Sequence, residues 1–391
     1  MAKRTGGFIG QDGLNAPDPA TGVSASGGDT QATVSFTAPS DVGGAAITGY
    51  RVQDSTGAFG ASGSASPITV TGLTNGTNYT FNVWAINPFG WSSPSDASGS
   101  VSPAVAPRGI FMAVGNEQSN IMEYIQIATT GNATDFGDLL FSVFSTSNGQ
   151  TSSTTRGIIA GGDDYRNVIQ YVTIANTGNA IDFGDLTEGK YAFAGCSNSV
   201  RAVYFGGFTG SRSNVIEYIT IATTGNGTDF GDLDVGLNDN AGLASSTRGI
   251  QAGGYSGSTR NVISYVTIAS TGNATDFGDL TTARYSLSAG ANATRGLFGG
   301  GNSSNVIDYI TIASTGNASD FGDLSQNKQD LGAVTSSLRA VFAGGQNGGT
   351  LTNVMEYVTI ANTGNVTDFG DLSVASSDNR GSASNAHGGL S

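Results

Sequence analysis

The chain has 391 residues, 60 of them glycine, and only 12% of its residues are charged. This composition is typical of short strands joined by tight turns, so it predicts an all-β protein. The net charge of −14 argues against binding to nucleic acid, which requires clustered Lys and Arg, and no run of 18 apolar residues is present that could span a membrane.

The first 15 residues form a glycine-rich arm that cannot build a core of its own. The arm starts MAKRTGGFIGQDG and has no apolar stretch behind its two basic residues, so it does not read as a secretory signal. We therefore expect synthesis in the cytoplasm. The arm should be disordered alone and should become ordered on docking to a neighbouring protein, with Phe8 in the interface.

A separate unit follows at residues 16–104, without any copy of the repeats found further along. Apolar and polar residues alternate within it, as they do in half-buried strands, in the segments 31–39, 46–55, 66–73 and 77–87. About seven short strands in such a length predict a β-sandwich.

The phrase LTNGTNYTFNVWAINPFGWSSPSDAS, from Leu73 to Ser98, closely resembles the later strands of fibronectin type III domains. The resemblance implies that Tyr79 makes the corner that ties two strands together. Phe36 stands where that family usually has a tryptophan, and we expect this difference to alter the core without changing the topology.

The alternation within segment 77–87 predicts where the Trp84 side chain points. If Tyr79, Phe81, Val83 and Ala85 face the core, Trp84 faces outward because strand side chains alternate. Such a residue is either an interface residue for a partner or a cross-strand packing partner on the solvent face.

Six near-copies of one phrase occupy residues 105–391, and NVISYVTIASTGNATDFGDL from Asn261 is a clear example. An arginine opens the segment before each copy, and these arginines lie 44 to 48 residues apart: Arg108, Arg156, Arg201, Arg248, Arg295 and Arg339. A period of this size is typical of one blade of a β-propeller.

One repeat contains four strand-like segments, which in the fifth unit are 285–292, 295–301, 305–313 and 318–324. They predict one four-stranded antiparallel blade. The third segment is apolar on both sides, and in the third unit these residues are Val215, Ile219 and Ile221 on one side and Ile216 and Tyr218 on the other. A strand buried on both faces must lie between two layers, which stacked blades supply.

The two ends of the array predict that it closes. The first repeat lacks a first strand, and the C-terminal phrase NRGSASNAHGGLS matches the first-strand phrases of the other repeats. We therefore expect a six-bladed β-propeller whose C-terminal strand completes the first blade, because closure removes open edges. An open solenoid is the alternative.

Paired glycines end the second strand of five repeats and resemble those of the kelch repeat, which implies positive φ angles and close approach of the backbone: Gly161–Gly162, Gly206–Gly207, Gly253–Gly254, Gly300–Gly301 and Gly344–Gly345. Kelch blades usually carry a tryptophan near the fourth strand. This chain has a phenylalanine in each comparable place, so the array is kelch-like: Phe136, Phe183, Phe230, Phe277, Phe321 and Phe369.

The turn phrase TGNATDFGDL and its near-copies contribute two aspartates per repeat: Asp135 and Asp138, Asp182 and Asp185, Asp229 and Asp232, Asp276 and Asp279, Asp320 and Asp323, Asp368 and Asp371. A calcium site is one interpretation, although the spacing lacks the alternating oxygens of a calcium loop. The other is structural, because Asp and Asn side chains stabilise turns by bonding nearby backbone amides.

Loops joining the second and third strands differ between repeats, as do the segments joining successive repeats, and propeller topology places both on one face. The variation reflects either blade-specific binding or drift. If this face binds, aromatic and charged side chains suit a polysaccharide or a polar protein surface, and the candidates are Asp163, Asp164, Tyr165, Arg166, Phe208, Arg212, Tyr255 and Arg260.

Enzymatic activity is not expected, and neither a cofactor nor a metal is predicted. The one histidine, His387, lies in the segment expected to close the ring, so no His-dependent catalytic or metal constellation can form. The one cysteine, Cys196, sits among small and apolar residues, which favours a buried structural thiol over a nucleophile.

The opening GGFIGQDGLNAPDP, the fibronectin-like unit and the repeats of the type ITIASTGNATDFGDL together resemble virion proteins of marine tailed bacteriophages, especially those of cyanobacteria. The resemblance implies an exposed virion structural protein, present in many copies. Its arm and fibronectin-like domain would attach it to other virion proteins, and its propeller would contact host polysaccharide or protein. The alternatives are a purely architectural capsid or tail protein without a ligand, and a cellular scaffold.

Overall fold

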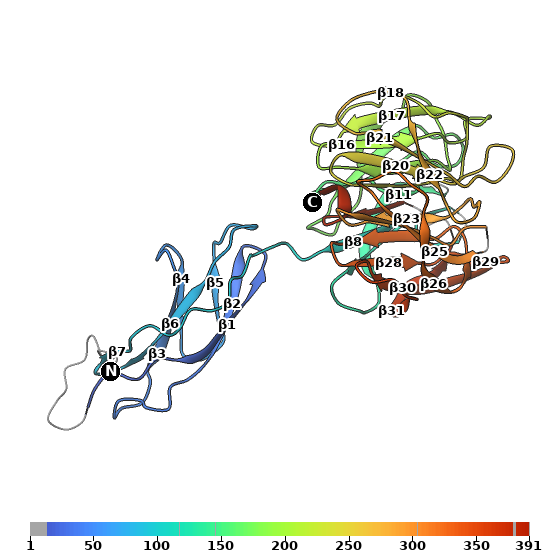
Figure 1. Cartoon of the computed structure of the whole chain (residues 1–391). Coiled ribbons are helices and arrows are strands. Elements are labelled where there is room, and N and C mark those ends of the chain that lie inside the picture. The colour runs from blue at the N-terminus through green and yellow to red at the C-terminus, as the bar shows by residue number, and fades with distance from the viewer. Residues whose placement is uncertain (1–13, 117, 145, 303, 378–380, 391) are drawn as a thin grey trace. The chain divides into compact units, whose positions relative to one another are not determined.

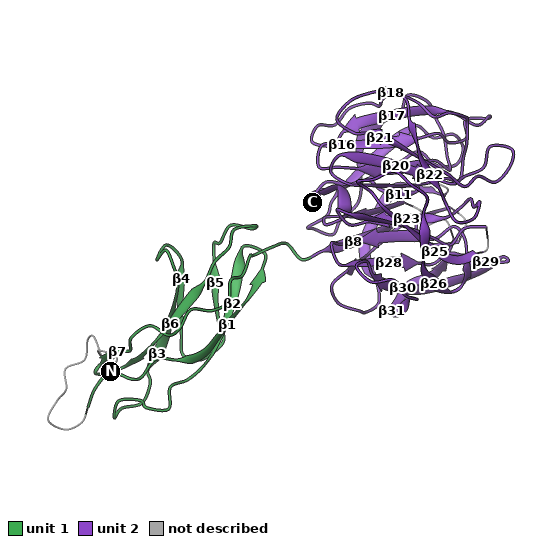
Figure 2. Ribbon diagram, in the orientation of Figure 1, with its two compact units in different colours: residues 1–106 green, residues 107–391 purple. Residues whose placement is uncertain are grey.

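A computed structural model describes residues 14–116, 118–144, 146–302, 304–377 and 381–390 of the protein, so the expected interface residue Phe8 lies outside the described residues. The chain divides into two compact units, residues 1–106 and 107–391 (Figure 2). Strands dominate both units (Figure 1), and within the described ranges the one helical element is the 3-10 turn η1 (Gly388–Leu390). The predicted all-β class is confirmed.

Unit 1 consists of two antiparallel sheets that share one core. The first sheet has the order β1 (Thr21–Gly28), β2 (Gln31–Thr37) and β5 (Ile68–Thr71). The second has the order β4 (Gly60–Gly63), β3 (Gly49–Asp54), β6 (Phe81–Asn87) and β7 (Gly90–Trp91). These seven strands form the sandwich that the alternating segments predict.

The alternation along β6 places its residues as expected. Phe81, Val83 and Ala85 are fully buried in the core of unit 1, while Trp84 is half-buried and lies opposite Arg51 on the neighbouring strand. The Tyr79 hydroxyl accepts a hydrogen bond from the backbone N–H of Thr74, at 3.1 Å. The predicted inward-facing residues of this strand and the predicted tyrosine corner are thus confirmed.

Phe36 fills the position where related domains have a tryptophan, and it remains in the core. Its ring is 8% exposed and lies 4.7 Å from that of Tyr50, centroid to centroid. The sandwich topology is retained with the smaller ring.

In unit 2 the six sequence repeats form mainly antiparallel strands. Repeats 1 and 2 comprise β8 (Arg108–Met112), β9 (Ser119–Gln126), β10 (Thr134–Val143), β11 (Gly149–Gln150), β12 (Arg156–Ala160), β13 (Val168–Thr173) and β14 (Ile181–Asp185). Repeats 3 and 4 comprise β15 (Ala194–Ser197), β16 (Arg201–Phe205), β17 (Val215–Thr220), β18 (Thr228–Asp232), β19 (Ala241–Ala244), β20 (Arg248–Ala252), β21 (Val262–Thr267) and β22 (Thr275–Asp279). Repeats 5 and 6 comprise β23 (Ser288–Ala291), β24 (Arg295–Gly299), β25 (Ser304–Thr311), β26 (Ser319–Lys328), β27 (Gly332–Thr335), β28 (Arg339–Ala343), β29 (Gln346–Asn347), β30 (Thr350–Thr359) and β31 (Thr367–Ser376), and β32 (Gly381–Ser384) follows.

The fifth repeat has the expected four-stranded order β23–β24–β25–β26. In the first repeat the C-terminal strand β32 pairs antiparallel with β8, so Ala383 lies opposite Ile110. The C-terminus therefore supplies the strand that the first repeat lacks, and this prediction is confirmed.

The second repeat departs from the pattern at its first strand. The two-residue strand β11 runs parallel to β19 and β32 through Gly149, while the Thr151 carbonyl next to it still accepts a hydrogen bond from the Ile158 N–H of its own repeat. A Cβ atom on Gly149 would lie 2.1 Å from the carbonyl oxygen of Gly195 and 2.4 Å from that of Gly242. Only glycine allows the first strands to approach so closely.

The third strand of each repeat is packed on both faces, as predicted. In β17, Ile216 and Tyr218 contact the cluster around Phe230 of the same repeat. Ile219 instead packs with Phe183 of the preceding repeat. No repeat can bury both faces of this strand alone, so the hydrophobic effect holds neighbouring repeats together.

Two polar contacts recur between every pair of neighbouring repeats. The arginine that opens the second strand donates through Nη1 to a carbonyl just after the third strand of the next repeat: Arg108 to Ile174, Arg156 to Ile221, Arg201 to Ile268, Arg248 to Ile312, Arg295 to Ile360, and Arg339 to Ile127. The turn asparagine accepts from an aspartate N–H of the preceding repeat: Asn132 from Asp371, Asn179 from Asp138, Asn226 from Asp185, Asn273 from Asp232, Asn317 from Asp279, and Asn365 from Asp323. Both sets therefore also join repeat 6 to repeat 1.

The paired glycines allow a close backbone approach. Gly206 and Gly207 have φ angles of 66° and 109°. A Cβ atom on Gly206 would lie 2.6 Å from the Leu237 carbonyl oxygen, which accepts a hydrogen bond from the Gly207 N–H at 2.8 Å. The positive φ angles and the close approach were both expected from the sequence.

Candidate binding surface

Three aromatic rings lie together where repeat 2 meets repeat 3. Tyr165 comes from the loop between β12 and β13, Tyr191 from the segment before β15, and Phe208 from the loop after β16. The Tyr165 and Tyr191 ring centroids are 5.6 Å apart, those of Tyr191 and Phe208 are 5.4 Å apart, and Tyr165 stacks on Phe208 at 6.5 Å. Spacings of this kind are typical of favourable aromatic pairs.

A second group lies where repeats 3, 4 and 5 meet. The Arg212 guanidinium lies 4.6 Å from the centre of the Tyr255 ring, which contacts Tyr285 edge-on at 5.9 Å. Arg212 also donates through Nε to the Asn238 side chain at 3.2 Å. We call Tyr165, Tyr191, Phe208, Tyr255 and Tyr285 the aromatic row.

Backbone pairing fixes the aromatic row. Phe208 pairs with Tyr191 on one side and with Arg212 on the other, and the latter bridge links the two groups. Tyr255 pairs with Asn238 in the equivalent way. The loops between second and third strands therefore lie beside the segments that join repeats, as expected from the sequence.

Tyr165 is the most exposed member of the aromatic row, at 48%. It and Asp164 have φ angles of 53° and 58°, in the left-handed region that non-glycine residues avoid. Such strain is concentrated at functional sites, because the surrounding structure must hold the residue in place.

Charged candidates divide into surface and structural groups. Arg260 pairs with Asp234 at 2.8 Å on the surface, and the Arg166 guanidinium lies 5.1 Å from the centre of the Phe141 ring. Asp163 is only 6% exposed, accepts a hydrogen bond from the Phe144 N–H, and also contacts Gln118. Its carboxylate is therefore engaged within the protein.

The pKa of Tyr191 is raised, first by burial and then by the nearby Tyr165 and Asp239. Both effects favour the neutral hydroxyl, which can donate and accept hydrogen bonds.

Sequence reasoning missed Tyr191, Tyr285, Asn238 and Asp234. These residues precede the first strands of their repeats, whereas the candidates were taken from the loops after the second strands. The signal was a tyrosine in the same place in two joining segments, KYAF and RYSL. Their contacts connect the separate candidates into one surface.

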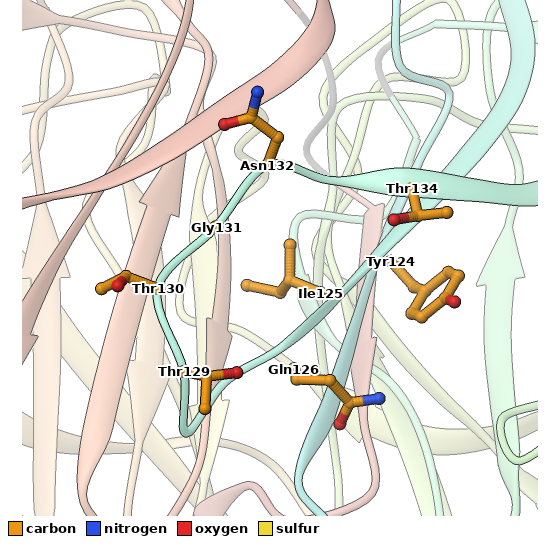
Figure 3. Close-up of a pocket in the computed structure, with 8 residues that line it drawn as sticks. All are labelled: Tyr124, Ile125, Gln126, Thr129, Thr130, Gly131, Asn132 and Thr134. Atoms are coloured by element: carbon orange, nitrogen blue, oxygen red, sulfur yellow. The ribbon is translucent and has the colours of Figure 1, made fainter.

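A different hollow lies in the turn between the third and fourth strands. In repeat 1 it has a volume of about 200 Å³ and is lined by Tyr124, Gln126, Thr129, Thr130 and Thr134 among others (Figure 3). The same positions form a hollow of about 170 Å³ in repeat 4.

The repeated aspartates lie in the fourth strands that follow this turn, and the second aspartate of each pair acts through its backbone. Asp138 is an example: its N–H donates to the side chain of Asn179, and its carbonyl accepts from Ala180. The asparagine thus bonds a neighbouring repeat and not its own turn, which differs from the structural interpretation made from sequence. Among the described residues, no group of three or more His, Cys, Asp or Glu side chains is placed to hold a metal ion.

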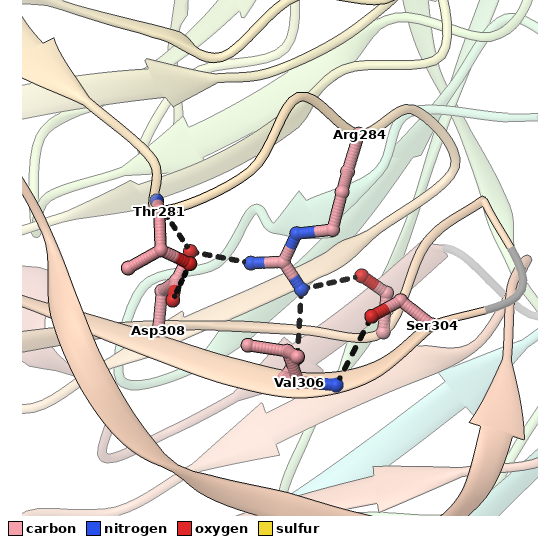
Figure 4. A network of polar contacts seen from close by, with 6 residues as sticks. Thr281, Arg284, Ser304, Val306 and Asp308 are labelled. Carbon is pink, nitrogen blue, oxygen red and sulfur yellow. Dashed lines mark hydrogen bonds and ion pairs between the residues drawn. The ribbon is translucent and has the colours of Figure 1, made fainter.

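Among the described residues, three buried ion pairs between neighbouring repeats were not predicted from the sequence. Each has a nitrogen–oxygen distance of 2.6 Å: Lys190–Glu217, Arg284–Asp308 and Lys328–Glu356. Arg284 also donates to the carbonyls of Gly300 and Val306, and Thr281 donates to Asp308 (Figure 4). Burial lowers the pKa of Arg284, while the charge of Asp308 and its hydrogen bond to Arg284 oppose that shift.

Cys196 and His387 are both buried. Burial raises the pKa of the Cys196 thiol to about 12, which makes it a poor nucleophile and confirms the buried thiol. His387 lies after β32 and not within the closing strand. Its Nδ1 accepts from the Gly389 N–H at 3.1 Å, and its Nε2 lies 3.2 Å from the Ser152 carbonyl oxygen.

Residues 17–100 match the family model of the fibronectin type III domain, so unit 1 contains such a domain. No curated protein is significantly similar to the chain. Within the described ranges, no helix has the length and apolar character needed to cross a membrane.

Proposed function

We propose that unit 2 is a six-bladed, kelch-like β-propeller closed by β32. Support comes from the contacts that join repeat 6 to repeat 1, since they are the same as those between every other pair of neighbours. Arg339 donates to Ile127, and Asn132 accepts from the N–H of Asp371. The pairing of β32 with β8 adds the fourth strand of the first blade.

We infer that the protein is a non-enzymatic structural protein of a bacteriophage particle, exposed on an appendage or fibre, whose propeller binds host surface polysaccharide. The aromatic row carries this proposal. Aromatic faces offer apolar area to the C–H groups of sugar rings, and side chains such as Arg212 and Asp234 offer hydrogen bonds to hydroxyl groups. The origin in a virion rests on the resemblance of the opening and repeat phrases.

The fibronectin type III domain is proposed to attach the protein to other virion proteins. Phe89 and Trp91 at the turn between β6 and β7 are 42% and 49% exposed. Asn87 beside them donates to the carbonyl of Asn15, so the start of the described chain is held close to these rings. Exposed aromatic residues of this kind are enriched in protein interfaces.

Binding to an array of bacterial surface polysaccharides tests the adhesive role of the full chain. Replacing both rings, Tyr165→Ala and Tyr255→Ala, should weaken binding roughly tenfold or more, because truncating aromatic anchors costs ~1 kcal/mol or more each.

The matched control is Trp91→Ala, since Trp91 in unit 1 has almost the same exposure as Tyr165. Its binding should equal that of the unmodified chain. An affinity that the double tyrosine variant leaves unchanged for every bound glycan contradicts the proposed site, and silence of the unmodified chain on all glycans favours the architectural alternative.

A further inference from the structure

The hollows in repeats 1 and 4 occupy the same eight positions of the repeat. In repeat 1 these are Tyr124, Ile125, Gln126, Thr129, Thr130, Gly131, Asn132 and Thr134, and in repeat 4 they are Tyr265, Val266, Thr267, Ser270, Thr271, Gly272, Asn273 and Thr275. Figure 3 shows the chain curving around this space in repeat 1. A hollow that recurs at equivalent positions is a property of the repeat.

The lining is neutral and rich in hydroxyl groups. In repeat 4 it offers the hydroxyls of Tyr265, Ser270, Thr271 and Thr275 and the amide of Asn273, with no charged side chain. Each of the two hollows is smaller than the ~300 Å³ of drug-sized pockets, so it suits a ligand about the size of one sugar ring.

The tyrosine in this lining is held rigidly. The Arg248 guanidinium lies 4.8 Å from the centre of the Tyr265 ring, and Phe277 contacts the ring edge-on at 6.0 Å. Arg108 and Phe136 hold Tyr124 in the same way in repeat 1. A group held by its neighbours loses little conformational freedom when a ligand binds.

One exposed threonine is identical in all six turns: Thr130, Thr177, Thr224, Thr271, Thr315 and Thr363. No hydrogen bond from these hydroxyls to another described residue is found. The loops between the second and third strands, in contrast, differ in every repeat. Contacts within the fold therefore do not account for the identity of this side chain, whereas a ligand common to all repeats does.

We propose that the turns between third and fourth strands form repeated binding pockets for a neutral, hydroxyl-rich ligand, namely single residues of a neutral glycan. These pockets are separate from the aromatic row. Weak sites repeated around one chain, and on many chains, raise apparent affinity by ~10²- to 10⁴-fold for a surface dense in the same sugar.

Repeat 2 should bind least well. It carries Ile181 where the other repeats have Thr or Ser, and this isoleucine is 58% exposed. A polar ligand that accepts or donates a hydrogen bond at this hydroxyl in the other repeats cannot do so in repeat 2. Repeat 2 therefore serves as an internal comparison for the other five.

Methyl NMR of the full chain tests the proposal, with threonine methyl groups labelled and each signal assigned by a single Thr→Val substitution. The probes are the methyl glycosides of glucose, galactose, mannose and N-acetylglucosamine. At least one sugar should shift the six turn threonine signals, with Thr177 beside Ile181 responding least. The variant Ile181→Thr should bring the response of Thr177 to that of the other turns.

The exposed Thr→Val changes should leave stability within ~0.5 kcal/mol, so loss of binding cannot be assigned to unfolding. The variant Tyr165→Ala with Tyr255→Ala should retain the turn responses, which separates this site from the aromatic row. No response to any of the four sugars overturns the proposal, as does a Thr177 response that Ile181→Thr leaves unchanged.

Discussion

Burial decides the chemistry of single side chains in this protein, and His387 is the clearest case. Its ring is 3% exposed, and burial lowers its pKa to about 4, with the hydrogen bond to Ser152 opposing the shift. In the neutral ring Nδ1 accepts from Gly389 while Nε2–H donates to the Ser152 carbonyl. Protonation of Nδ1 would place two N–H groups against each other.

The pH dependence of stability should report this buried histidine. The unfolded chain binds a proton near pH 6.5, whereas the folded chain does so only near pH 4. The stability contributed by the neutral ring is therefore complete above pH 6.5 and is lost as the pH falls to about 4. The expected loss is about 3 kcal/mol in the free energy of unfolding, measured by denaturant titration.

His387→Gln is the control, because the chain has no other histidine. The difference between the two stability curves should change between pH 6.5 and 4 and stay flat above that window. Parallel curves throughout would contradict the buried neutral ring.

Single residues were predicted well where burial alone decided their state. Cys196 lies in an apolar phrase, and its buried thiol followed from that pattern. The turn asparagines were placed correctly in a turn, but Asn179 bonds Asp138 of another repeat, 41 residues away. Local sequence gives no signal for a partner at that distance.

At the scale of elements, the third strand carries the boundary between repeats. Glu217 on β17 is fully buried, pairs with Lys190 and accepts a hydrogen bond from the Thr187 N–H at 2.7 Å. In repeat 4 both equivalent positions are uncharged: Leu237 takes the place of Lys190, and Ser264 takes the place of Glu217. The boundary before repeat 3 therefore contains a buried ion pair, whereas the equivalent boundary before repeat 4 contains two uncharged side chains.

Removing one partner of the pair should cost much more than removing both. Glu217→Ala leaves the Lys190 charge buried without its partner, and we expect a loss of ~3–5 kcal/mol in the free energy of unfolding. The double variant Lys190→Leu with Glu217→Ser copies the pair found at Leu237 and Ser264 and should recover most of that loss. Urea unfolding measures both, and equal losses in the two variants would show that the charges are not coupled.

The strands were predictable because their signal is local and repeated. The period-2 pattern and the paired glycines predicted the four strands of the fifth repeat, and in unit 1 the same alternation predicted the core around Phe81. The ion pairs were not predictable, since Lys190 lies in a segment that reads as a polar connection. Three members of the aromatic row, Tyr165, Phe208 and Tyr255, were candidates. Their partners Tyr191 and Tyr285 come from other segments and were not.

At the scale of the whole molecule, closure decides whether the repeats form one cooperative unit. Each boundary buries one face of a third strand, and an open array would leave the outer faces of its first and last repeats in water. The contacts between Arg339 and Ile127 and between Asn132 and Asp371 fall on the boundary that only a closed array has. The proposal of a closed ring rests on these contacts and on the pairing of β32 with β8.

The distance across that boundary in solution tests closure most directly. Spin labels attached to cysteines at Ala128 and Leu338, both exposed, lie on either side of the junction of repeats 6 and 1, where Arg339 donates to the Ala128 carbonyl. Labels at Ala361 and Thr294 have the same relation across the interior junction of repeats 5 and 6, where Arg295 donates to the Ala361 carbonyl. Cys196 should stay unlabelled because it is buried.

Pulsed electron paramagnetic resonance then gives one distance distribution for each pair. A closed ring predicts that the two distributions coincide. A distribution for Ala128 and Leu338 that is much longer than that for Ala361 and Thr294 would show an open array and contradict the account.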